Sequence, residues 1–171
     1  MISNATLDAA RAGDRQAFRA IVEAFRDPVF RYAHRMLGNA TDAEDVVQET
    51  CVRIFVNLKQ FQPGGNFRAW VYRIATNLCL DKKREGHRLL PVKAESSVDP
   101  GSAAETREII RAAERAMVQL PEKQRAALVL RVIEGFPYRV IAEILDTTEN
   151  NARWYLFEAR RQMRQMLNGH T

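Results

Sequence analysis

The 171-residue chain has few of the residues that build metal sites and disulfide frameworks, with two cysteines and three histidines. Cys51 and Cys79 both fall within apolar helical patterns, so we expect two buried thiols in a reducing compartment. No Cys/His spacing fits a zinc site, and no glycine-rich phosphate loop or nucleophile elbow occurs. The sequence therefore predicts no metal, no cofactor and no catalytic residue.

Long apolar runs are also lacking. None approaches the roughly 18 residues that a membrane-spanning helix requires, and the N-terminus has no basic segment followed by an apolar one. We therefore expect a cytoplasmic protein with no direct membrane insertion. The net charge of +5 favours an anionic partner, most often nucleic acid or a membrane surface.

Helical periodicity dominates the chain, and no segment alternates for long as a strand would. We expect an all-α protein made of two small helical domains, residues 1–88 and 104–171, joined by a flexible linker at residues 89–103. The linker interpretation rests on the stretch from Glu85 to Ala103, which holds two prolines, two glycines and three serines and shows no helical period.

In the first domain the apolar spacing predicts four helices, over residues 6–25, 28–38, 41–58 and 67–84. Pro28 is expected to start the second helix and Gly38 to end it. Thr41 is the expected N-cap of the third, because Glu44 follows three residues later as in a capping box.

In the second domain helices are expected over residues 109–117, 121–134, 137–145 and 148–167. The last two are separated by a brief turn at Asp146 and Thr147, and Thr147 or Thr148 can cap the final helix. Two short helices with such a turn between them, the second polar and ending basic, form a helix-turn-helix pattern, which is a weak signal when taken alone.

The helix expected over residues 41–58 begins with a row of carboxylates. Asp42, Asp45 and Glu49 are spaced to share one face, opposite the apolar face. One interpretation is that they complement the positive end of the helix dipole; the other is that they bind a basic protein. From the residues alone the dipole interpretation is preferred.

The helix expected over residues 67–84 carries a second stripe beside its apolar face, formed by an aromatic, an amide and basic residues: Trp70, Arg73, Asn77 and Arg84. An unpaired base that stacks on an aromatic ring gains about 1–3 kcal/mol, and Arg and Asn hydrogen-bond base edges or phosphates. The alternative is a half-buried Trp70 beside a solvated basic helix end. The residues alone do not decide between these interpretations.

Three stretches of the chain are distinctive: "NATDAEDVVQETCVRIFVNLKQF", "FRAWVYRIATNLCLDKKR" and "LPEKQRAALVLRVIEGFPYRVIAEIL". The first two resemble region 2, and the third resembles region 4, of a bacterial RNA polymerase sigma factor of the extracytoplasmic-function (ECF) group of the sigma-70 family. The resemblance extends from about Phe18 to Leu167 apart from the linker. It implies an alternative sigma factor, not itself an enzyme, that binds core RNA polymerase, directs it to specific promoters and helps melt the −10 element.

The resemblance also implies three sets of contacts. The clamp coiled coil of the polymerase largest subunit would bind Asp42, Asp45, Gln48 and Glu49. The single-stranded −10 element would contact Asn66, Phe67, Arg68, Trp70, Arg73, Asn77, Lys82, Lys83 and Arg84. The −35 element would contact Tyr138, Arg139, Thr148, Asn150, Asn151, Arg153 and Arg160. Two further partners follow from the group: the flap of the second-largest subunit and an anti-sigma factor.

The last helix departs from the family pattern. Trp154, Tyr155 and Glu158 stand where the family usually has small or basic residues, while Asp146 replaces the usual turn glycine, which Asp tolerates because it can adopt a positive φ. We therefore expect this helix to read an unusual −35 sequence or to dock on a protein. The alternative function is a sigma-like decoy or adaptor that binds an anti-sigma factor or another regulator without recognising a −35 element.

Overall fold

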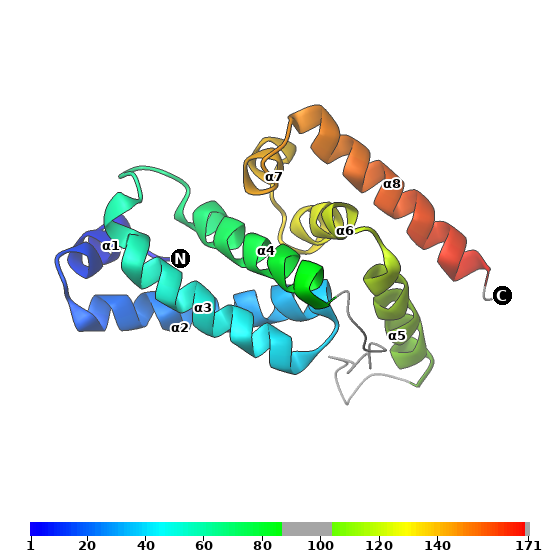
Figure 1. Cartoon of the computed structure of the whole chain (residues 1–171), viewed down its shortest axis with the longest axis horizontal. Helices are drawn as coiled ribbons and strands as arrows, with labels where there is room; N and C mark the ends of the chain where they lie inside the picture. The colour runs from blue at the N-terminus through cyan, green and yellow to red at the C-terminus, as the bar shows by residue number, and fades with distance from the viewer. Residues whose placement is uncertain (87–103, 170–171) are drawn as a thin grey trace.

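The computed structural model describes residues 1–86 and 104–169, and this part of the chain consists of helices and short connections (Figure 1). The first unit contains α1 (Asn4–Arg11), α2 (Arg15–Leu37), α3 (Ala40–Asn57), the short η1 (Leu58–Gln60) and α4 (Phe67–Gly86). The second contains α5 (Ala104–Gln119), α6 (Glu122–Leu128), the π-helical η2 (Val129–Ile133), α7 (Tyr138–Ile144) and α8 (Glu149–Asn168). The all-α expectation is confirmed, and the expected linker at 89–103 lies outside the described residues.

The N-terminal helices differ from the prediction. The chain breaks after α1, where Asp14 accepts hydrogen bonds from the backbone N–H groups of Gln16 and Ala17 and so caps α2. From there α2 continues through Pro28, so the predicted start of a helix at this proline is wrong. A proline inside a helix removes one backbone hydrogen bond, and the buried Ile21 and residues after Pro28 hold the long helix together from both sides.

The predicted N-cap of α3 is also wrong, because Asn39 occupies that position. Its Oδ1 accepts a hydrogen bond from the backbone N–H of Asp42 at 2.8 Å, and its Nδ2 donates to the Asp42 carboxylate at 2.6 Å. Thr41 and Glu44 consequently lie inside the helix. At the turn between α7 and α8 two expectations are confirmed. Asp146 adopts a positive φ of 49°, and Thr148 caps α8 because its hydroxyl accepts a hydrogen bond from the N–H of Asn151.

The burial of three residues departs from the apolar pattern. Cys79 is buried as expected, but Cys51 is only half-buried. Burial raises the pKa of both thiols, that of Cys79 to about 12, so neither is a ready thiolate at neutral pH. Ile109 and Ile110, which contributed to the prediction of α5, are exposed.

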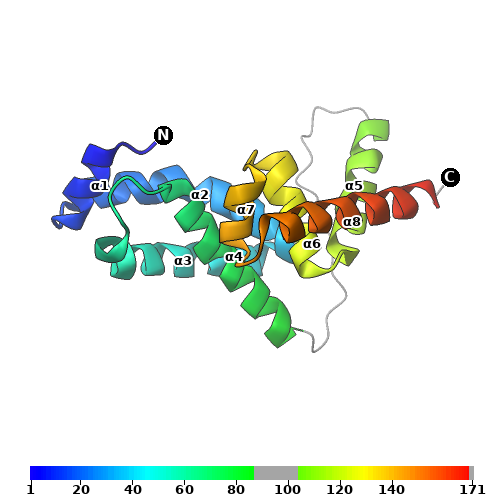
Figure 2. The ribbon, with the colours of Figure 1, turned by 90° about the horizontal axis from the view of Figure 1, so that it is seen from above.

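The two units pack against each other, with α4 against α7 and α2 against α5 and α6 (Figures 1 and 2). One continuous apolar cluster includes buried residues of both. At its edge the Tyr72 hydroxyl donates a hydrogen bond to the Glu134 carboxylate, and the Tyr72 ring meets Phe136 edge-on with centroids 5.2 Å apart. The two units are therefore closed on one another in this structure.

Arg125 lies buried where the units meet. Its guanidinium donates to the carbonyl of Met36 at the end of α2 and to the carbonyls of Met117, Val118 and Leu120 around the end of α5. Carbonyls at a helix C-terminus have no partner within the helix, so Arg125 satisfies several of them at once. Among the residues described, no helix combines the length and apolarity that a membrane crossing requires.

Candidate nucleic-acid interface

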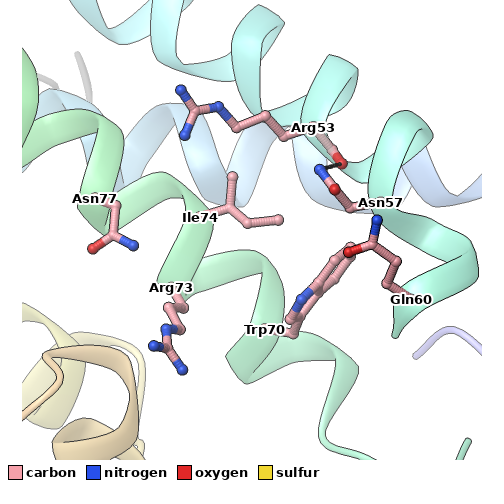
Figure 3. Close-up of a pocket in the computed structure, with 7 residues that line it drawn as sticks. All are labelled: Arg53, Asn57, Gln60, Trp70, Arg73, Ile74 and Asn77. Atoms are coloured by element: carbon pink, nitrogen blue, oxygen red, sulfur yellow. Dashed lines mark hydrogen bonds between the residues drawn. The ribbon is translucent and has the colours of Figure 1, made fainter. Parts of the chain in front are cut away.

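A pocket of about 360 Å³ lies between α3, η1 and α4 (Figure 3). Trp70 lies at its η1 end and Asn77 at the opposite end, with Arg73 and Ile74 between them on α4. Its lining combines one aromatic ring, one aliphatic side chain, two guanidinium groups and three amides. A planar ring with polar edges, such as an unpaired base, finds both stacking and hydrogen-bonding partners there.

Trp70 belongs to an aromatic cluster that supports it from behind. Its ring centroid lies 5.3 Å from that of Phe61 and 5.5 Å from that of Phe67, and Phe67 meets Phe25 edge-on at 5.6 Å. Trp70 itself is half-buried, so part of its ring remains open to the pocket. The cluster therefore fixes the ring without enclosing it.

The other side of the pocket is formed by three further residues, of which the sequence interpretation missed Arg53 and Asn57. Arg53, Asn57 and Gln60 reach it from α3 and η1, and the Asn57 amide donates to the carbonyl of Arg53 at 2.9 Å. These three polar residues recur at steps of four and three, the same spacing that revealed the stripe on α4. Their spacing was a signal that pointed to a second polar face.

Arg11 of α1 holds the rim of this pocket in place and was also missed. Its Nε donates to the carbonyl of Leu58 at 3.2 Å, its Nη2 donates to the carbonyl of Phe61, and its guanidinium lies 5.6 Å from the centre of the Phe61 ring. Because Trp70 packs on that ring, Arg11 is a positioning residue for the pocket. Nothing in the sequence near Arg11 distinguishes it from an ordinary helix-terminal arginine.

Some of the predicted −10 residues shape this region rather than line it. Asn66 caps α4 by accepting a hydrogen bond from the N–H of Ala69 at 3.0 Å, and Phe67 is buried in the aromatic cluster. Arg84 is exposed near the end of α4, 3.8 Å from the carboxylate of Asp81.

Two predicted −10 residues face the second unit instead. Arg68 forms an ion pair with Glu134 at 2.9 Å and lies 4.2 Å from the centre of the Phe136 ring. Lys83 is half-buried, and this burial, together with the nearby Arg125, lowers the pKa of Lys83 to about 8. In the closed arrangement both cations are therefore directed to the unit interface.

The four predicted polymerase-binding residues share the N-terminal half of α3, where Asp45, Gln48 and Glu49 are exposed and Asp42 is half-buried. Three of them are paired within the chain. Lys82 lies 3.4 Å from Asp42 and 3.1 Å from Asp45, and Arg53 lies 2.9 Å from Glu49. Partial burial lowers the pKa of Lys82, but the two carboxylates outweigh this effect, so that the pKa is raised. The row is thus joined to Lys82 on α4 and to Arg53, which lines the pocket.

An exposed apolar strip continues this row along α3. Val52, Phe55 and Val56 are exposed, Phe55 to 68%, although Phe55 meets Phe18 edge-on at 5.1 Å. They follow Asp45 and Glu49 at helical spacing, away from the buried face. Sequence interpretation missed them because it followed the apolar residues of the core face. An acidic row that merges into apolar residues suits a protein partner better than a solvated face.

The predicted −35 residues lie at the start of α7 and the start of α8, except Arg160, which lies in the second half of α8. Arg139, Asn150 and Arg160 are exposed. Thr148 is occupied by its capping role, and the Asn151 amide donates to Thr147 Oγ1 at 3.1 Å.

Arg153 links the two helices of this motif. It pairs with Glu149 at 2.6 Å, and its guanidinium lies 4.3 Å from the centre of the half-buried Tyr138 ring. The arrangement presents the N-terminal half of α8 to solvent, as a helix-turn-helix requires.

The unusual residues of α8 separate into different environments. Trp154 is 53% exposed and Phe157 64% exposed. Tyr155 is half-buried and packs against the main core. Glu158 receives hydrogen bonds from Nε and Nη2 of Arg161 at 3.1 and 2.7 Å, so its negative charge is offset.

An apolar groove of about 480 Å³ runs between η2 and the C-terminal half of α8. Val132, Ile133 and Leu167 line it and are exposed, and Arg160 and Arg164 border it. Sequence interpretation did not identify this groove, since its residues come from four different elements. Its chemistry suits a helix with an apolar face and acidic neighbours.

Comparison with known proteins adds the family relationship. Residues 21–89 match Sigma-70 region 2 and residues 110–163 match Sigma-70, region 4. The ECF RNA polymerase sigma factor SigW of Bacillus subtilis (strain 168) is 30% identical over 172 residues, which cover 92% of each chain. The ECF RNA polymerase sigma factor SigE of Mycolicibacterium smegmatis is 35% identical over 171 residues, which cover 93% of this chain and 66% of that protein. The solved structure of the sigma factor RpoE in complex with the anti-sigma factor NepR from Bartonella quintana has a similar fold, with a TM-score of 0.76, 21% identity, and coverage of 88% of this chain and 96% of that one.

Proposed function

The chain belongs to the ECF group of the sigma-70 family, and from this premise we propose how its surfaces divide the work of an alternative sigma factor. Such a subunit binds core RNA polymerase, directs it to specific promoters and helps to melt the −10 element. As a transcription initiation factor it supplies binding and positioning, and we propose that it makes and breaks no covalent bond itself. Its proposed place of action is the cytoplasm, where bacterial polymerase meets promoter DNA.

The α3–α4 pocket is proposed to receive a base of the opened −10 element. Taking a base out of the stack costs a few kcal/mol. Stacking on Trp70 offsets roughly 1–3 kcal/mol of this, while Arg73 and Asn77 offer donors and acceptors to the base edge or the phosphates. The single observation that carries the proposal is the half-open Trp70 ring, which a surrounding aromatic cluster fixes in a polar pocket.

The acidic row of Asp42, Asp45 and Glu49, with Gln48, is proposed to dock on the basic clamp coiled coil of the polymerase. The exposed Val52, Phe55 and Val56 would extend that contact with apolar area. Since the carboxylates now pair with Lys82 and Arg53, a basic partner competes for them. Docking would then release Arg53, which lines the pocket, and Lys82 further along α4, and both could meet phosphates of the open strand.

The second unit is proposed to hold the −35 element and the polymerase flap. The first turns of α8 would enter the major groove, where Asn150 and Asn151 suit adenine edges and Arg153 and Arg160 suit phosphates. The flap of the second-largest subunit is assigned to the apolar groove beside α8. An anti-sigma factor is a further proposed partner, as in the complex of RpoE with NepR. No observation favours the decoy alternative. Of the unusual α8 residues that suggested it, Glu158 has its charge offset by Arg161 and Tyr155 packs against the core.

Reconstituted transcription with core polymerase tests this division. The double variant Asp45→Lys, Glu49→Lys should lower polymerase association more than tenfold, because it places like charges against a basic partner. Asn77→Ala should leave association unchanged and lower strand opening, measured by permanganate reactivity of the −10 thymines. Glu23→Lys, which breaks a comparable exposed pair with Arg19 on α2, is the matched control and should change neither. Unaltered polymerase association in the charge-reversed variant would refute the docking assignment.

A further inference from the structure

We propose that Trp154 determines promoter specificity by placing its indole ring against the C5-methyl group of a thymine in the −35 element. The proposal rests on the proposed −35 function of α8 and deepens it. It assigns a role to a residue that departs from the family pattern and that the core of the protein does not need.

Trp154 lies on the outward ridge of α8. The buried side of this part of the helix is formed by Ala152, Leu156 and Ala159. On the opposite side, at steps of four, three and four residues, lie Asn150, Trp154, Phe157 and Arg161. This ridge begins with an amide, continues through two exposed aromatic rings and ends with arginine. In Figures 1 and 2 α8 lies along the outside of the second unit.

The position of Trp154 is not explained by packing. Its ring lies 5.6 Å from that of Tyr155, but 53% of the residue remains exposed. An indole side chain left in water gives up the free energy that its burial would provide. Phe157, one turn further, is exposed in the same direction. Two neighbouring aromatic residues on a ridge indicate a surface that a ligand covers.

The surroundings of the ridge favour duplex DNA as that ligand. Arg153, Arg160 and Arg164 lie along one side of the aromatic ridge, and on its other side Arg161 offsets the charge of Glu158. The surface is therefore apolar along its centre and basic along one side. The major groove is its complement, since phosphates border the groove and the thymine methyl is its apolar feature. The first turns of the second helix of a helix-turn-helix are also the part that enters the groove.

The experiment uses holoenzyme and a cognate promoter, identified from transcript start sites after overproduction of the chain. Each thymine of the −35 element is replaced in turn by deoxyuridine, which removes the methyl group and keeps the base pair. With the wild-type protein, one position should lose about fourfold in holoenzyme affinity, the effect of one methyl group returned to water. With Trp154→Ala the affinity should already be lower, and deoxyuridine at that position should cause no further loss.

Two variants complete the test. Trp154→Phe keeps an apolar ring and should retain part of the thymine preference. Ile109→Ala removes an apolar side chain of α5 that is at least as exposed and should retain all of the thymine preference. If Trp154→Ala loses affinity while its thymine preference is undiminished at every position, the ring does not read a methyl group and the proposal is overturned. If a scrambled −35 element leaves wild-type binding unchanged, the proposed −35 function has failed, a result distinct from failure of the methyl contact alone.

Discussion

The two tryptophans of this chain lie on opposite kinds of surface. Trp70 is half-buried at the end of a pocket, with Phe61 and Phe67 packed behind it, whereas Trp154 stands on the ridge of α8 and is 53% exposed. A base that has left the duplex is a free ring and needs a concave site that is already formed. A base that remains paired presents only its edge, so a protruding side chain has to reach it. The difference in support matches the two targets that we propose for these rings.

The comparison predicts its largest effect for alanine substitution of the two rings. Trp70→Ala should lower promoter opening by about 5- to 150-fold, equivalent to one lost stacking interaction, and should lower the free energy of unfolding by about 2 kcal/mol because it leaves a gap in the cluster. Trp154→Ala should change the free energy of unfolding by less than about 0.5 kcal/mol. Permanganate reactivity and urea titration measure the two quantities.

The ring comparison would be wrong if both variants lost the same free energy of unfolding. Trp154 would then be a packing residue in solution, and its exposure would have no bearing on DNA. Equal losses of promoter opening without any loss of stability in either variant would instead show that the cluster behind Trp70 contributes nothing to its placement.

A smaller effect on promoter opening is expected from Arg11, which supports Trp70 indirectly and has no counterpart beside Trp154. Arg11→Ala leaves the carbonyls of Leu58 and Phe61 without their donor, so the free energy of unfolding should fall by about 1–3 kcal/mol. Promoter opening should fall while polymerase association is unchanged, and Arg11→Lys should restore part of the opening.

Arg19→Ala is the control for Arg11. Arg19 is exposed on α2 and pairs there with Glu23, so that its loss leaves no buried carbonyl without a donor. If Arg11→Ala lowered polymerase association and promoter opening to the same extent, Arg11 would stabilise the unit as a whole, and its role in positioning the pocket would be excluded.

The sequence predicted the helices and the central stripe of the pocket, because periodicity and side-chain chemistry are local properties. It did not predict that α2 runs through Pro28, since the loss of one hydrogen bond is outweighed by tertiary packing on both sides. It did not predict that in the closed arrangement Arg68 meets Glu134, 66 residues further along the chain. Arg11 was missed for the same reason: its partners follow 47 and 50 residues later. Contacts between residues so far apart in the sequence produce no local repeat or spacing from which they could be predicted.

The smallest effect is expected at Lys83. The two tryptophans also differ in their surroundings, since the second unit covers part of α4, which carries Trp70 and Lys83, but leaves the ridge of α8 open. Burial and Arg125 lower the pKa of Lys83 to about 8, while Glu122 and Cys79 act in the opposite direction. In the unfolded chain this amine stays protonated to about pH 10.4, so the closed structure disfavours its charge at neutral pH. Lys83→Met should therefore raise the melting temperature by about 2–4 °C at pH 7, the equivalent of about 1 kcal/mol for a half-exposed group.

The pH dependence follows from the same shift. Between pH 7 and 9 the folded protein releases the Lys83 proton while the unfolded chain retains it, so wild-type stability gains relative to Lys83→Met as pH rises. The difference in melting temperature should consequently shrink across this range. Lys123→Met, on the exposed side of α6, should differ from wild type by an amount that does not vary with pH. If the difference in melting temperature between Lys83→Met and wild type were equally constant between pH 7 and 9, the amine would be solvated. The second unit would then not pack against α4 in solution as it does in this structure.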